Sequence, residues 1–147
     1  MNIGARLVLA LVWLLHLLPW PLLHRLGRGL GALLYRVARS RRHVARRNLE
    51  LCMPNHSAHE REAIVREHFA WLGRSLVERG VLWHHSADRL RSMMRIEGDV
   101  HLADRSTRPV MWLVPHFVAL EAAAAAVQLF QGKRGATSYQ AQSNALF

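Results

Sequence analysis

The sequence predicts an α/β domain. The run Pro109–Val114 is continuously apolar, as expected for a strand buried on both faces of a sheet. An alanine-rich helix over 119–130 follows it, and 136–139 has the composition of a further strand. The segment 93–97, with a turn at Gly98, predicts another strand. A strand, a helix and a second strand in this order form the βαβ unit of a parallel sheet.

Composition limits the class of protein. The chain has 147 residues, of which 51% are hydrophobic, enough for one domain with a core. Lys and Arg number 20 against 10 Asp and Glu, a formal net charge of +10, and Lys133 is the only lysine. Arginine suits phosphates and carboxylates, so we expect an anionic partner, although a solvated basic face has the same composition. Cys52 is the only cysteine, which excludes an internal disulfide.

The N-terminus carries an apolar run, Leu7–Leu23. It reaches the roughly 20 residues that cross a bilayer only by including His16 and two prolines. Most arginines follow the run, and no small-residue cleavage site does, so a secretory signal peptide is disfavoured. We therefore predict that residues 1–24 form an uncleaved anchor or an in-plane membrane helix, with residues 25–147 on the cytoplasmic side.

Two further helices are predicted before the sheet. The segment 27–48 has an apolar stripe flanked by arginines, which suits an anionic membrane surface and equally a packed position on the domain. Ser57 followed by Glu60 is a capping box, the start of a helix that we expect to end near Gly80. The core positions predicted for that helix are Val65, Phe69, Leu72 and Leu76. A short helix is predicted over 100–104.

His116 and Glu121 are the candidate catalytic residues. Pro115 disfavours helix at the residue before it, so His116 is predicted in a strand-to-helix loop and Glu121 in the first turns of the helix. The loop can fold the imidazole back towards the carboxylate, which would fix the histidine tautomer while the histidine takes a proton from an alcohol. Both residues also have ordinary roles, since glutamate is favoured in a first helical turn and most single histidines are structural.

Other chemical patterns are weaker. The neighbours His84 and His85, and the pair His56 and His59, lack a third ligand, and no H-E-x-x-H segment occurs, so no metal site is predicted. The sequence has neither a G-x-S-x-G elbow nor a phosphate-binding P-loop. The arginine-rich part is too apolar overall to predict nucleic-acid binding.

The segment from Pro115 to Glu121 resembles the H-x4-D/E motif of membrane acyltransferases. It is most similar to the motif of the lipid A biosynthesis (lauroyl/myristoyl) acyltransferases of Gram-negative bacteria. Further segments that resemble this family occur in the same order along the chain, at 46–54, 69–78 and 95–98. With the apolar N-terminus, the resemblance covers essentially the whole chain.

The resemblance implies a glycerolipid-acyltransferase-like α/β domain on the cytoplasmic face of the bacterial inner membrane. It implies transfer of a fatty acyl chain from acyl carrier protein to a hydroxyl of a lipid A precursor, with His116 as general base and Glu121 orienting it. The implied partners are acyl carrier protein, the lipid A precursor and anionic membrane lipid, without a cofactor or metal. Tyr139 and Asn144 match substrate-binding positions of the family, although Gln140 stands where an arginine usually follows the tyrosine.

The family runs to about twice this length, so the resemblance also implies that residues 25–147 form a partial acyltransferase domain. Two alternatives stay open. One is a lysophospholipid or glycerolipid acyltransferase that uses the same motif with another acceptor. The other is a catalytically inactive, membrane-bound remnant that keeps the N-terminal anchor and the basic helix.

Overall fold

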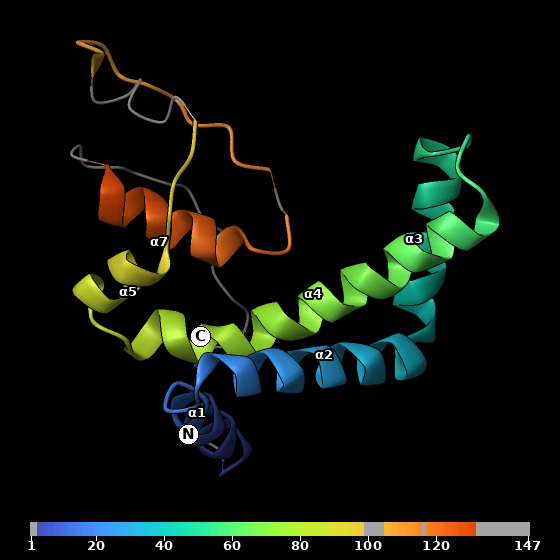
Figure 1. Ribbon diagram of the computed structural model, residues 1–147, viewed down its shortest axis with the longest axis horizontal. Coiled ribbons are helices and arrows are strands. Elements are labelled where there is room, and N and C mark those ends of the chain that lie inside the picture. Colours follow the sequence, from blue (N-terminus) through green and yellow to red (C-terminus); the bar gives the residue numbers. More distant parts are fainter. Residues whose placement is uncertain (1–2, 99–104, 116, 132–147) are drawn as a thin grey trace.

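The computed structural model describes residues 3–98, 105–115 and 117–131. The antiparallel helices α2 and α4 form its centre, with α1 against one end of the pair and α3 rising from the other (Figure 1). Helices α5 and α7 lie on the opposite side of α4 from α1 (Figure 1). The helix bounds are α1 Ile3–Leu15, α2 Trp20–Val37, α3 Arg39–Cys52, α4 Ala58–His84, α5 Ala87–Met93 and α7 Leu120–Phe130.

Helices α2 and α4 pack backbone to backbone because glycines meet at their contact. A Cβ atom built on Gly73 of α4 would lie 2.2 Å from the carbonyl oxygen of Gly27 and 2.3 Å from the amide nitrogen of Gly31, both in α2. No side chain fits into that space. Gly80 approaches α1 in the same way, since its Cβ would lie 2.3 Å from the carbonyl oxygen of Val12. Glycines therefore set how closely three helices pack.

The core lies mainly along one face of α4. The prediction that Val65 and Phe69 face the core is confirmed. Leu72 and Leu76 are half-buried instead, because the buried face continues in four-residue steps from Phe69 to Val77. The buried apolar residues are Leu23, Val65, Phe69, Ala70, Val77, Val81 and Leu90.

The start of α4 is as predicted and its end is not. The Ser57 hydroxyl accepts a hydrogen bond from the Glu60 amide at 3.2 Å, and the Ser57 amide donates to Glu60 Oε2 at 2.7 Å, which completes the capping box. The helix continues past Gly80 to His84. Gly80 is buried under α1, so it serves close packing rather than helix termination.

The helix predicted over 27–48 is two helices. Ala38, with φ −84° and ψ 61°, separates α2 from α3, so the prediction of one continuous helix is wrong. This break lets α3 turn away from α2 and rise beside the first turns of α4 (Figure 1). Side-chain contacts between the three helices stabilise the turn.

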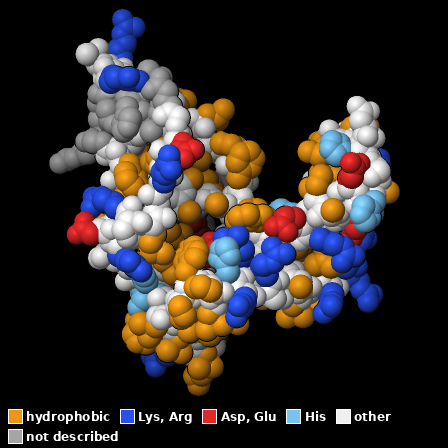
Figure 2. All heavy atoms as spheres, in the orientation of Figure 1, with side chains coloured by type: hydrophobic (Ala, Val, Ile, Leu, Met, Phe, Trp, Pro, Cys, Tyr) orange, Lys and Arg blue, Asp and Glu red, His pale blue; other side chains and the backbone are white. Residues whose placement is uncertain are grey.

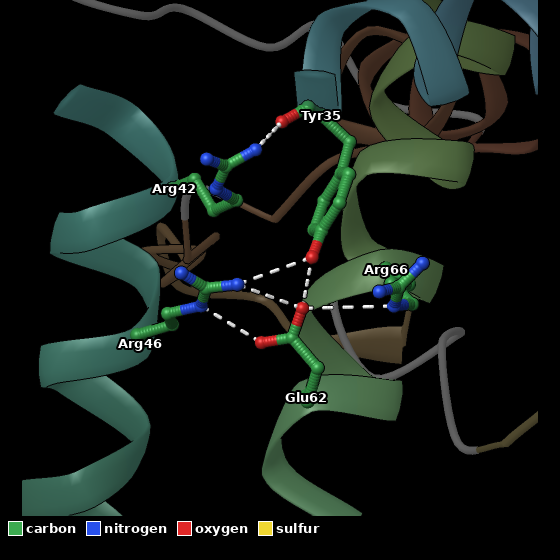
Figure 3. Close-up of polar contacts among 5 residues, drawn as sticks. All are labelled: Tyr35, Arg42, Arg46, Glu62 and Arg66. Carbon is green, nitrogen blue, oxygen red and sulfur yellow. Dashed lines mark hydrogen bonds and ion pairs between the residues drawn. The ribbon is translucent and has the colours of Figure 1, made fainter. Parts of the chain in front are cut away.

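A polar cluster holds α3 against α4 (Figure 3). Arg46 donates from Nε to Glu62 Oε2 at 2.7 Å and from Nη2 to Oε1 at 2.9 Å, and the Tyr35 hydroxyl donates to the same carboxylate. The Arg42 and Arg66 guanidinium carbons lie 4.9 and 4.7 Å from the centroid of the Tyr35 ring, in cation–π range. The hydrogen bonds from Arg46 lower the pKa of Glu62 to about 2.

The apolar N-terminal run does not form one helix. Helix α1 ends at Leu15 and α2 begins at Trp20, after Pro19 in an extended conformation. Proline disfavours helix at the residue before it, which explains why the run is divided there. Among the described residues, every helix is too short or too polar to cross a membrane. A single spanning anchor is therefore not what residues 3–24 form in this structure.

The predicted α/β architecture is not found in the described residues, which are helical and contain no strand. Residues 94–97 and 109–115 have no regular secondary structure. Met111 and Leu113 are 96% and 95% exposed, so the prediction of a strand buried on both faces is wrong. A strand forms only when a neighbour accepts and donates its backbone hydrogen bonds, and no such neighbour lies in the described ranges.

Two smaller predictions in this part of the chain are confirmed. The helix predicted over 119–130 is α7. Gly98 has φ 103°, a left-handed conformation that favours glycine and suits the predicted turn. The short helix predicted over 100–104 and the strand predicted over 136–139 lie outside the described residues.

Candidate active site

Glu121 lies in the first turn of α7, as predicted. The Phe117 amide donates to the Pro115 carbonyl at 2.8 Å, and the Leu120 amide donates to the Phe117 carbonyl at 3.1 Å. These short-range bonds turn the chain directly into the helix. Ala119, at the N-cap, offers no capping side chain, so the anionic Glu121 is the group that complements the positive end of the helix dipole.

Arg79 of α4 forms an ion pair with Glu121. Its Nη2 atom lies 2.8 Å from Glu121 Oε1, and the side chains are 39% and 42% exposed. Oε2 of Glu121 and Nε of Arg79 are both buried, and neither has a hydrogen-bond partner among the described residues. The carboxylate is thus held at one oxygen, and its second oxygen remains able to accept a hydrogen bond.

Ser75 makes a second contact between α4 and the segment that precedes α7. Its hydroxyl donates to the carbonyl oxygen of Val118 at 3.0 Å. Ser75 and Arg79 are four positions apart, so they lie on the same face of α4. One face of α4 therefore contacts the chain on both sides of the start of α7.

The other predicted site residues cannot be placed beside Glu121. His116, Tyr139 and Asn144 lie outside the described residues. The predicted contact between the imidazole and the carboxylate stays a prediction. Sequence reasoning missed Arg79, because it is far from Glu121 in the chain and belongs to no local motif. Its four-residue step from Ser75 is the only regularity that could have drawn attention to it.

An apolar hollow of about 180 Å³ lies among α2, α4, α5 and α7. Ala122, the residue after Glu121, contributes to its wall. The remaining lining residues come from α2, α4 and α5 and from the residue that follows α5: Trp20, Glu78, Val81, Leu82, Leu90, Met93 and Met94. Most of these side chains are hydrocarbon or thioether, so the hollow suits an apolar group rather than a charged one.

Three histidines, His16, His84 and His85, lie close together where α1 and α4 end. The ring centroid of His16 lies 5.3 Å from that of His84 and 5.7 Å from that of His85. Burial, with smaller effects of His16 and Arg89, lowers the pKa of His85. In the part of the chain that the structure describes, no three His, Cys, Asp or Glu side chains are arranged to hold a metal ion.

Comparison with known proteins identifies the class. The family model of bacterial lipid A biosynthesis acyltransferases matches residues 2–147. The chain is 41% identical over 115 residues to the lipid A biosynthesis palmitoleoyltransferase of Escherichia coli K12, which is 77% of this chain and 38% of that protein. It is 35% identical over 115 residues to the lauroyltransferase of the same organism, with the same coverage. It is 33% identical over 129 residues to the myristoyltransferase, which is 86% of this chain and 38% of that protein.

The chain belongs to the bacterial lipid A biosynthesis acyltransferase family, as its sequence segments indicated. It spans well under half the length of the curated relatives that it matches. No solved structure matches it.

Proposed function

We propose that this chain acts in acyl transfer, moving a fatty acyl group from acyl carrier protein to a hydroxyl of a lipid A precursor. Family membership supports the reaction class, since the relatives are named palmitoleoyl-, lauroyl- and myristoyltransferases of lipid A biosynthesis. The apolar hollow, whose wall includes Ala122 of α7, supports a hydrocarbon substrate. The net charge of +10 suits two anionic substrates, an acidic carrier protein and a phosphorylated glycolipid.

The observation that carries the proposed mechanism is the Glu121 carboxylate, held at one oxygen at the start of α7. His116 would take the proton of the acceptor hydroxyl, and the alcohol oxygen would attack the thioester carbonyl carbon. The carbon–sulfur bond then breaks, and the carrier thiol leaves with the proton that His116 returns. Glu121 would hold the histidine tautomer and compensate the imidazolium charge, the role of the carboxylate in a catalytic triad.

The proposed location is the cytoplasmic face of the bacterial inner membrane, with α1 lying in the bilayer surface. Hydrophobic side chains gather over α1 in Figure 2, and its exposed members include Ile3, Leu7, Leu11 and Leu14. An amphipathic or apolar helix with such a surface gains free energy by entering the headgroup region. Arginines of α2 and α3 would add attraction to anionic lipid.

Acyl transfer from an acyl carrier protein thioester to a lipid A precursor tests this proposal. We expect His116→Ala to reduce the rate roughly 100-fold or more, the usual contribution of a general base. His43→Ala is the matched control, because His43 is an exposed histidine of α3, the helix at the far end of α4. Equal rates for wild type and His116→Ala would contradict the proposed role of His116.

The same preparation distinguishes the alternatives. Transfer to a lysophospholipid, with none to the lipid A precursor, would assign the chain to glycerolipid acylation. Binding to anionic vesicles without transfer by wild type or variant would identify a membrane-bound remnant. Binding to DNA that is stronger than binding to vesicles and decreases steeply with salt would indicate nucleic acid as the partner.

A further inference from the structure

The ion pair between Arg79 and Glu121 joins only one atom of each side chain and leaves a second polar atom of each buried. Within the described residues it is the only ion pair between α4 and α7. Arginine and carboxylate commonly join through two parallel hydrogen bonds. Here one nitrogen, Nη2, meets one oxygen, Oε1, at 2.8 Å, while Nε of the arginine and Oε2 of the glutamate remain buried without partners in the described ranges.

A buried carboxylate oxygen without a donor is costly. Leaving such an atom unsatisfied destabilises the fold, because the atom has lost its hydrogen bonds to water and gained none in return. The second oxygen of Glu121 is therefore placed where another donor would be stabilising. Arg79 does not occupy it, since its contact with the carboxylate is made through Oε1. The arrangement leaves Glu121 paired on one side and available on the other.

The same face of α4 also restrains the backbone beside Glu121. Ser75, one turn before Arg79, donates to the Val118 carbonyl at 3.0 Å. The contact fixes the chain three residues before Glu121, and Arg79 fixes the carboxylate itself. Two restraints from one rigid helix limit both the position and the rotation of the glutamate side chain.

We propose that Arg79 is a positioning residue: it holds Oε1 of Glu121 so that Oε2 is presented to the proton-accepting histidine. This inference rests on the proposed roles of His116 and Glu121. Arg79 acts through the carboxylate and touches neither substrate nor histidine in this scheme. An ion pair that only attached α7 to α4 would not affect the histidine.

The imidazole pKa of His116, measured by NMR titration of the 147-residue chain in neutral detergent, tests the inference without requiring turnover. Glu121→Gln should lower this pKa by about 0.5 to 1, because a nearby anion favours the imidazolium. Arg79→Met should lower it as well, because the unrestrained carboxylate moves away from the histidine. Arg79→Lys should restore at least half of the difference, since it keeps a cation at the same place.

Arg66→Met is the matched control, since Arg66 also lies on α4 and pairs with a glutamate, Glu62, at 3.6 Å. It should leave the His116 pKa unchanged. Thermal midpoints of Arg66→Met and Arg79→Met close to that of wild type would show that the fold is intact. Arg79→Gln replaces Arg79→Met if the latter does not fold, because it keeps a hydrogen-bond donor at that position.

Two results would contradict the role of Arg79 while leaving the proposed mechanism intact. A rise of the His116 pKa in Arg79→Met would mean that Arg79 acts only as a nearby positive charge, and no change would mean that the pair is only structural. If Glu121→Gln itself leaves the pKa unchanged, the histidine–glutamate pair fails, and the proposed mechanism and this inference fail together. In acyl transfer, Arg79→Met should lower kcat roughly 10- to 100-fold at unchanged KM, whereas a higher KM alone would assign Arg79 to substrate binding instead.

Discussion

The two sides of α4 are held by different means. On one side, Gly73 lies against the backbone of α2, and no side chain separates the two helices. On the other side, α7 has no buried residue. Its half-buried Leu129 packs against the core, Arg79 pairs with Glu121, and Ser75 bonds Val118 just before the helix. The α2 contact depends on shape and excludes any added atom. The contact with α7 relies on directional polar interactions, which hold the Glu121 carboxylate in place although α7 is not buried.

This difference separates the scaffold from the site. Close backbone packing makes α2 and α4 one rigid support, because packed interiors tolerate little change of volume. The lightly packed α7 places the Glu121 carboxylate at a partly exposed surface. We therefore expect substitutions at the α2 contact to affect global stability, and substitutions at the α7 contact to affect local order or chemistry.

The largest effect is expected from Gly73→Ala. Its new Cβ would lie 2.2 and 2.3 Å from backbone atoms of α2, which cannot move aside as a flexible side chain can. The helices must separate, so we expect a loss of about 3 kcal/mol, at the upper end of typical overpacking costs. Thermal unfolding followed by circular dichroism measures it. A melting temperature equal to that of wild type would disprove the close contact between α2 and α4.

Glu62→Gln should have the next largest effect, because it weakens the cluster that attaches α3 to α4. We expect a loss of about 1 to 2 kcal/mol at pH 7, less than for a fully buried pair because solvent screens part of it. The pKa of Glu62 is about 2 in the folded chain against 4.5 for a free carboxyl. The stabilisation is therefore complete above about pH 4.5 and is lost as the pH falls towards 2.

The difference between the Glu62→Gln and wild-type melting temperatures should thus shrink between pH 5 and pH 2. Glu67→Gln is a suitable control, because Glu67 lies on the same helix and its pair with Arg28 is longer, at 3.5 Å, and more exposed. A difference that stays constant over this pH range would show that the cluster does not depend on an ionised Glu62.

Ser75→Ala should have a smaller and more local effect. It removes the hydrogen bond to the Val118 carbonyl, a contribution of about 0.5 to 1.5 kcal/mol. Because α7 is lightly packed, we expect faster hydrogen exchange at the amides of its first turn and unchanged exchange in α2. Uniformly faster exchange across both helices would show that α7 is as integral to the fold as α2.

The sequence predicted local features well and packing poorly. The capping box at Ser57 and the start of α7 follow from side chains that act on their own neighbours. Family membership followed from ordered segments of sequence. The predicted end of α4 at Gly80 was wrong. A glycine that terminates a helix cannot be told from the sequence alone from a glycine that allows a second helix to pack closely, which is the role of Gly80.

The strand prediction failed for a related reason. An apolar run such as 109–114 shows that the chain can bury side chains there, but not that a partner strand is present among the described residues. Similarly, Glu121 was predicted from a local pattern, whereas Arg79 was not. The ion pair of Arg79 with Glu121 depends on how α4 and α7 are brought together, which no local motif in the chain shows.

Gly29→Ala should have an effect opposite in sign to that of Gly73→Ala, because it stabilises the protein. Gly29 lies on α2 between Gly27 and Gly31, yet a Cβ built on it meets no atom within 4 Å. Alanine loses less backbone entropy than glycine in a helix interior, so we expect a gain of about 0.5 to 1 kcal/mol. Thermal unfolding of Gly29→Ala and Gly73→Ala in parallel measures the expected gain and the expected loss of stability with the same type of substitution. If Gly29→Ala were also strongly destabilising, the loss at Gly73 would reflect a general intolerance of alanine at these glycines rather than the contact between α2 and α4.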